Sequence, residues 1–282
     1  MKKAHSYDSK VAKISNYIVS SLLILLFLLP LIFLFINSFK SQSDIMANPL
    51  ALPKTWDFSF IQKAAKEINY LGSTLITFLL TLFSVSIIVV LSSISAWILA
   101  RTKTRLSNFI FLFFVLSMLI PFQSLMFPML KILDSLDIKN YLGLLIMYVG
   151  FGLSLAIFFY HGFIKTIPVS IEEAAIIDGA SLLQTFFLIV FPVLKTITVT
   201  VVILNVTWVW NDYLLPYLVI GNQRNKTLVL QLYFARQKYG QYGNQWDVIF
   251  PAVLISMMPI IVLFFTVQKQ FIHGMTSGAV KG

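Results

Sequence analysis

Residues 170–192 read SIEEAAIIDGASLLQTFFLIVFP, and they place three acids, Glu172, Glu173 and Asp178, between two long apolar runs. The turn and capping residues of this stretch predict a short helix before a longer one. Ser170 and Glu173 have the spacing of a capping box, in which each side chain accepts a hydrogen bond from the other residue's backbone amide. The first helix is therefore expected to start close to Ser170.

The same stretch predicts where the short helix ends. Gly179 suits the left-handed turn that closes many helices, and Ser181 with Gln184 forms a second capping box that opens the next apolar run. We expect a short helix over residues 171–178, closed by Gly179. Local stability could explain each acid by itself, since acids favour the first turn of a helix, but it leaves the exposed isoleucines of this helix unexplained.

The composition identifies a membrane protein. Of 282 residues, 58% are hydrophobic and 11% are charged, whereas soluble domains carry about 25% charged residues. A transmembrane helix needs about 20 apolar residues. The sequence predicts an all-α fold with one transmembrane domain over residues 1–282, and its six spans lie near residues 17–39, 73–100, 106–130, 142–164, 182–209 and 247–267. Pro121 and Pro128 are expected to kink the third span.

The short basic segments predict the orientation. Basic residues crowd two of them, Lys2, Lys3, Lys10 and Lys13 before the first span, and Arg101, Lys103 and Arg105 in the second loop. Positive charge favours the cytoplasmic side, so both termini and the loop of residues 165–181 are predicted to be cytoplasmic. The net charge of +10 is scattered over the loops, which argues against nucleic-acid binding.

Other polar residues are candidates for a translocation path. They lie within or at the ends of spans and are Gln123, Tyr148, Asn205, Trp210, Asn211 and Asp212. Most such groups only bond neighbouring helices, and that reading stays open for each. His161 is expected to be a packing residue. The sequence has no cysteine, no zinc-protease motif and no phosphate-binding loop, so we expect neither a metal site nor ATP hydrolysis in this chain.

Three ordered motifs resemble one family. Glu173-Ala174-Ala175 with Gly179, Ile189 and Pro192 is similar to the EAA loop of permease subunits in ABC importers, although Phe191 stands where leucine is common. The longer form, EEAAIIDGAS with Gln184 and Phe186, resembles the carbohydrate branch and within it the maltose-transporter type. Trp210-Asn211-Asp212 and the tail GMTSGAVKG, residues 274–282, are similar to further elements of that branch.

The resemblance implies a permease subunit that imports sugars, oligosaccharides above all, in a bacterial cell membrane. It implies four kinds of partner: a second homologous permease, two ATP-binding cassette subunits that bind ATP and Mg²⁺, an extracytoplasmic sugar-binding protein, and the lipid bilayer. The expected contacts with the ATPase come from Glu172, Glu173, Ala174, Ala175, Asp178 and Gly179, with the tail residues Gly278, Ala279, Val280, Lys281 and Gly282. The expected contacts with the binding protein come from the outer loop, through Asn222, Gln223, Arg224, Tyr239 and Tyr242.

Three alternatives are weighed against this prediction. A stand-alone secondary carrier would need ionisable groups in the middle of its spans, and these spans contain almost none. A membrane enzyme would need a catalytic constellation, which the sequence does not show. An importer of the same architecture for a solute other than a sugar stays open, because no residue in the sequence identifies the substrate.

Overall fold

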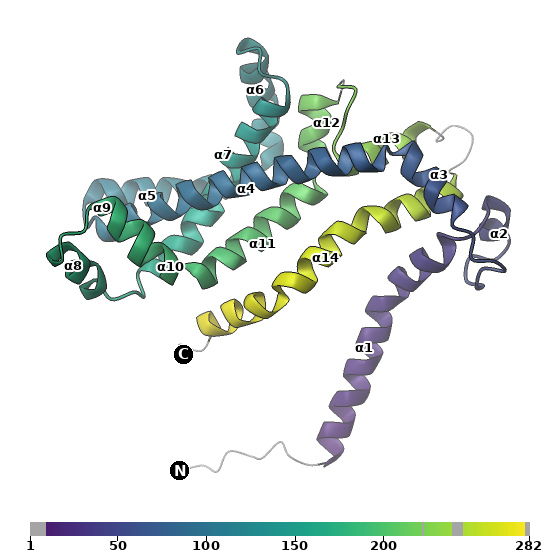
Figure 1. Ribbon diagram of the computed structural model, residues 1–282, viewed down its shortest axis with the longest axis horizontal. Helices are drawn as coiled ribbons and strands as arrows, with labels where there is room; N and C mark the ends of the chain where they lie inside the picture. Colours follow the sequence, from purple (N-terminus) through teal and green to yellow (C-terminus); the bar gives the residue numbers. More distant parts are fainter. Residues whose placement is uncertain (1–9, 222, 239–244, 280–282) are drawn as a thin grey trace. The chain divides into compact units, whose positions relative to one another are not determined.

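The computed structural model describes residues 10–221, 223–238 and 245–279, and over these ranges the chain is helical with no strand (Figure 1). The helices are α1 Lys10–Asn37, α2 Gln42–Ala47, α3 Ser59–Glu67, α4 Tyr70–Arg101, α5 Arg105–Ser117, α6 Phe122–Ser135, α7 Tyr141–Ile164, α8 Ser170–Ile177, α9 Leu182–Gln184, the π-helix η1 Thr185–Val190, α10 Phe191–Val193, α11 Lys195–Asn211, α12 Leu214–Ile220, α13 Leu228–Lys238 and α14 Trp246–Ala279.

The chain forms two compact units. The first contains residues 1–68 and 234–257, and the second contains residues 69–233 and 258–282. Within the first unit the ring of Phe33 meets that of Phe250 edge-on at 5.6 Å. The ammonium group of Lys63 also lies 2.9 Å from the carboxylate of Asp247. These contacts join α1 and α3 to the start of α14.

The second unit is built around α4, α7 and α11, which contact one another along their lengths. The residues that fill its core are apolar, among them Ile88, Ala156, Ile157, Tyr160 and Leu194. Gly152 of α7 lies where α4 and α11 both approach α7, since a Cβ atom there would lie 2.7 Å from Asn205 Oδ1 and still closer to the end of the Ile88 side chain. Small residues let membrane helices approach closely, and this glycine is one such residue.

The structure contains four to six candidate membrane spans. Four single helices are long and apolar enough, at Lys13–Asn37, Tyr70–Arg101, Tyr141–Ile164 and Trp246–Thr266. Two further spans would be bent pairs, α5 with α6 at 103° and Leu182–Val193 with α11 at 77°. The kink predicted at Pro121 is confirmed as a larger bend, since α5 and α6 meet at 103° and α6 begins directly after Pro121. Pro128 lies inside α6 without ending it.

The bend in the fifth span was not predicted. Residues Thr185–Val190 wind as a π-helix, and Pro192 follows within α10. Proline has no amide hydrogen to continue the helical ladder, and π-helical turns are uncommon outside such irregular segments. The chain turns at Leu194, whose amide donates to the carbonyls of both Val190 and Phe191. The predicted continuous helix over residues 182–209 is therefore two pieces.

Candidate functional site

Helix α8 forms the turn between the fourth and fifth predicted spans, and its start differs from the prediction. The helix begins at Ser170, with Val169 as its N-cap and no side-chain cap. The amides of Glu172 and Glu173 instead donate to the carbonyl of Val169, at 2.9 and 3.1 Å. The predicted capping box of Ser170 and Glu173 is wrong, because Ser170 already lies inside the first turn.

The end of α8 is as predicted. Gly179 has φ +88°, a left-handed conformation that costs other residues about 1–2 kcal/mol. The amide of Ala180 donates to Ala175 O and that of Gly179 donates to Ile176 O, both at 3.0 Å. This pair of bonds is the Schellman arrangement that satisfies the last carbonyls of a helix. The chain can therefore reverse direction within two residues.

The start of α9 confirms the second capping box. The amide of Gln184 donates to Ser181 Oγ at 3.3 Å, and the amide of Ser181 donates to Gln184 Oε1 at 2.8 Å. The polar side chains fix the point at which the chain leaves the α8 turn. Packing adds to this, since α8 contacts η1.

Glu172 is turned into the protein. Its Oε1 accepts hydrogen bonds from Arg101 Nε at 2.9 Å and Nη2 at 2.6 Å, and its Oε2 accepts one from Trp97 Nε1 at 2.9 Å. Arg101 Nη2 also donates to the carbonyl of Ile167 at 3.1 Å. The side chains of Arg101 and Glu172 are only 18% and 7% exposed, so this is a largely buried ion pair that joins α8 to the end of α4.

The sequence interpretation had placed Glu172 with its neighbours as an ATPase contact and had used Arg101 only for the orientation. Nothing in the linear sequence pairs residues that lie 71 positions apart. A long basic side chain at the end of a span can reach the interface without a partner, so Arg101 by itself did not indicate an acidic partner in a nearby loop.

The opposite side of α8 is open. We call it the α8 outer face, and its exposed residues are Ile171, Glu173, Ala174, Ile176, Ile177, Asp178 and Gly179. Ile177 is 84% exposed and Ile176 is 52% exposed. Exposed apolar side chains rimmed by charged groups are typical of protein-binding surfaces. Of the predicted contact residues, Ala175 is half-buried and Glu172 is buried.

Two of the predicted translocation-path residues meet in the structure. The hydroxyl of Tyr148 on α7 donates to Asp212 Oδ2 at 3.1 Å, and the amide of Leu214 donates to Asp212 Oδ1 at 3.0 Å. Burial raises the pKa of the Asp212 carboxyl, and these hydrogen bonds offset part of that rise. The ring of Trp208 stands edge-on to that of Tyr148, 5.4 Å between centroids. Asp212 thus closes the end of α11 against α7.

The other predicted path residues are not brought together. Asn205 and Asn211 donate to carbonyls of their own helix, at Val201 and Thr207, and Gln123 is exposed near the start of α6. His161 is buried and stacks on Phe111, 3.6 Å between ring centroids. This contact agrees with the predicted packing role.

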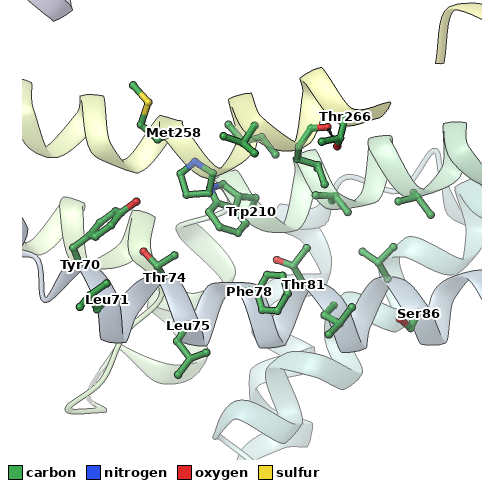
Figure 2. Close-up of a pocket in the computed structure, with 18 of the residues that line it drawn as sticks. Tyr70, Leu71, Thr74, Leu75, Phe78, Thr81, Ser86, Trp210, Met258 and Thr266 are labelled. Atoms are coloured by element: carbon green, nitrogen blue, oxygen red, sulfur yellow. Dashed lines mark hydrogen bonds between the residues drawn. The ribbon is translucent and has the colours of Figure 1, made fainter. Parts of the chain in front are cut away.

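A groove of about 980 Å³ lies along α4, α11 and the second half of α14 (Figure 2). Its lining is mainly aliphatic and aromatic, and Trp210 of the predicted path is part of it. Thr74, Thr81 and Trp210 each carry a buried polar atom with no hydrogen-bond partner among the described residues. So apolar a groove is suited to apolar chains or helices, and it offers few groups to a free sugar.

The loop and tail predictions fall largely outside the described residues. Gln223 and Arg224 are exposed, whereas Asn222, Tyr239 and Tyr242 lie outside the described ranges. Gly278 and Ala279 belong to the last turn of α14, and Val280, Lys281 and Gly282 lie beyond it. Among the residues that the structure describes, no group of three His, Cys, Asp or Glu side chains could hold a metal ion.

The chain is similar to transport proteins along its whole length. The family described as "Binding-protein-dependent transport system inner membrane component" matches residues 88–277. The probable starch degradation products transport system permease protein of Thermoanaerobacterium thermosulfurigenes is 36% identical over 100% of both chains. The multiple sugar-binding transport system permease protein of Streptococcus mutans is 32% identical, over 97% of this chain and 99% of its own.

A solved structure has the same fold. It is a chain of a bacterial ABC transporter involved in the import of the acidic polysaccharide alginate, with a TM-score of 0.80 and 22% sequence identity. The match covers 96% of this chain and 99% of that one. The helices described above are therefore arranged as in that transporter chain.

Proposed function

The chain belongs to the family of binding-protein-dependent transport system inner membrane components, and from this premise we propose that it is the permease through which an ABC importer moves oligosaccharides. Membership makes it a multi-pass membrane protein and a transport component, not an enzyme. It also implies ABC-transporter partners and a substrate-binding protein. The substrate class, the sites of contact and the composition of the complex are the proposed part.

One observation carries the substrate class. One relative that matches over the full length of both chains is a probable permease for starch degradation products. Another is a melibiose, raffinose and stachyose import permease of Bacillus subtilis, 32% identical over 90% of this chain. The substrates named for both relatives are short carbohydrates. A soluble sugar of this kind crosses a membrane only through a protein path, and we propose maltooligosaccharides as the first class to test.

We propose that the α8 outer face docks on a cytoplasmic ATPase subunit. Its support is the pairing of exposed isoleucines with the exposed acid Glu173, in a segment that the basic residues of the sequence assign to the cytoplasmic side. The apolar side chains would supply buried area, and Glu173 would pair with a basic residue and give specificity. The C-terminal residues 278–282 would make a second contact with the ATPase pair.

The complex would contain one further permease and two ATPase subunits in a bacterial cell membrane, and ATP and Mg²⁺ would bind to the ATPases alone. A sugar-binding protein would meet the outer segment of residues 222–245. The support for this assembly is the family's dependence on a binding protein and the absence of a phosphate-binding motif from the sequence.

Uptake measurements test the proposal. Cells from which this permease has been deleted are supplied with labelled maltotriose and maltotetraose, with and without the permease on a plasmid. The proposal expects uptake to require the permease and to stop when ATP is depleted. Restored uptake that follows the proton gradient and persists without ATP would contradict it, because a secondary carrier behaves in that way. Unimpaired maltooligosaccharide uptake in the deletion strain would contradict the proposed substrate class.

A further inference from the structure

The two adjacent glutamates of α8 lie in opposite environments. Glu173 is exposed on the α8 outer face, whereas Glu172 is 5% exposed and has three hydrogen bonds from the end of α4. A partner bound to the α8 outer face can reach Glu173 but cannot reach Glu172. The inward residue therefore needs a role of its own.

We propose that Glu172 is a positioning residue that fastens α8 to α4, so that a displacement of α8 by the ATPase moves α4 with it. The inference rests on the proposed function, since it concerns how that importer transmits motion. Arg101 holds both Glu172 and the carbonyl of Ile167, the residue that leads into α8. The guanidinium group of Arg101 therefore binds both α8, through Glu172, and the segment that precedes α8, through Ile167.

Trp97 extends the attachment to the fifth span. Its Nε1 atom donates to Glu172 Oε2, and its ring lies 5.3 Å from that of Phe186 in η1. Phe186 is 1% exposed, so this ring contact is part of the packed interior. The end of α4, the inner side of α8 and the irregular start of the fifth span therefore meet at one side-chain cluster, which consists of Trp97, Arg101, Glu172 and Phe186.

Helix α4 continues from this cluster to the other end of its unit. It has 32 residues and is therefore about 48 Å long, at 1.5 Å per residue. Near its opposite end Thr77 Oγ1 accepts a hydrogen bond of 2.8 Å from the amide of Leu228, the first residue of α13. Both residues are buried. A single helix thus connects the cluster with the start of α13, which lies within the outer segment of residues 222–245.

Charge makes the attachment difficult to release. A buried ion pair that loses one partner leaves an uncompensated charge in a poorly solvated place. Hydrogen bonds between ionised groups are also stronger than neutral ones, and Arg101 makes two of them to Glu172 Oε1. Glu172 and Arg101 should therefore stay together when α8 moves, which is the property that a mechanical attachment needs.

The test uses the complete importer in liposomes, with its ATPase subunits and its binding protein loaded with maltotetraose. Three versions of this chain are compared with the wild type: Glu172→Gln, Arg101→Met with Glu172→Gln, and the outward control Glu173→Gln. The double variant leaves no unpaired charge, and its glutamine can still accept from Trp97. It therefore keeps the fold even where the single variant does not.

We expect the ATPase to co-purify with the double variant as it does with the wild type. We also expect ATP hydrolysis stimulated by the loaded binding protein to fall at least about fivefold, the lower end of typical coupling factors. Glu173→Gln should instead reduce co-purification. Wild-type stimulation in the double variant would overturn the inference, and so would loss of co-purification equal to that of Glu173→Gln, since Glu172 would then face the ATPase.

Failure of the proposed function has a different signature. The wild-type complex would then show neither maltotetraose uptake nor stimulation by the loaded binding protein. Failure of the inference appears only in the comparison of the variants with a wild-type complex that does transport.

Discussion

Gly152 gives the most direct test of how α4, α7 and α11 pack. A Cβ atom at this position would lie 2.7 Å from Asn205 Oδ1 and closer still to the end of the Ile88 side chain. Gly152→Ala therefore forces at least two side chains to move. Overpacking of this kind costs about 1–3 kcal/mol, from which the better helix propensity of alanine recovers about 1 kcal/mol.

The same helix supplies matched controls. Gly150 and Gly162 also lie in α7, and a Cβ atom at either would meet nothing within 4 Å. Alanine at these positions has the propensity gain without the clash. We therefore expect Gly152→Ala to be less stable than either control variant by about 1–3 kcal/mol.

Unfolding by SDS titration from mixed micelles measures this difference. The free energy of unfolding is compared for the three single variants and the wild type under the same detergent conditions. If Gly152→Ala were as stable as Gly150→Ala, the close approach of the three helices would be refuted. An equal loss of stability in all three variants would also contradict the reasoning, because the loss would then come from replacing any glycine of α7 and not from the contact of residue 152 with Ile88 and Asn205.

Four further predictions concern single residues. Gly179→Ala should strain the left-handed turn after α8 by about 1–2 kcal/mol and lower uptake, and uptake at the wild-type level would show that the turn does not need glycine. Glu173→Lys should abolish co-purification of the ATPase, while Glu173→Gln should only weaken it. Glu173 does not cap the helix, so neither change removes a cap. Normal transport by both variants would show that Glu173 forms no charge pair with the ATPase. Thr77→Val should leave the buried amide of Leu228 without its acceptor and cost about 1–3 kcal/mol in the SDS titration, and an unchanged free energy would show that this bond is not formed. The folded state raises the pKa of Asp212 above its ordinary value of 3.8, so the contribution of this carboxyl to stability is complete below pH 3.8 and is lost as the pH rises through the folded-state pKa. Asp212→Asn should therefore flatten the dependence of the unfolding free energy on pH between these two pKa values. A variant that keeps the wild-type slope there would contradict this.

Much of the turn around α8 could be predicted because its signals are local. Gly179, Ser181 and Gln184 act on residues within a few positions of themselves, and the structure confirms all three. The error at Ser170 is of one residue. A capping box and a first-turn serine look alike in a sequence, and only the backbone of Val169 decides between them.

The features that the sequence did not predict depend on distant contacts. Glu172 looks like any first-turn acid until Arg101 and Trp97 are brought beside it. Pro192 was a local signal for the bend at Leu194 that the sequence interpretation did not use, whereas hydropathy does not distinguish a straight helix from the π-helical segment before it. The packing of Gly152 likewise depends on two other helices. The path residues were proposed only from polarity, which does not distinguish a lining group from one that bonds its own helix.

The central claim is that this chain is the permease subunit of an ATP-driven importer, and the proteins that co-purify with it test this most directly. The chain is tagged at its chromosomal locus, membranes are extracted in a mild detergent, and the purified complex is identified by mass spectrometry. The account predicts a second permease and an ATP-binding cassette subunit in stoichiometric amounts, with the ATP-binding cassette subunit alone lost in the Glu173→Lys variant. Purification of the chain alone, under conditions that keep other membrane complexes intact, would contradict the account.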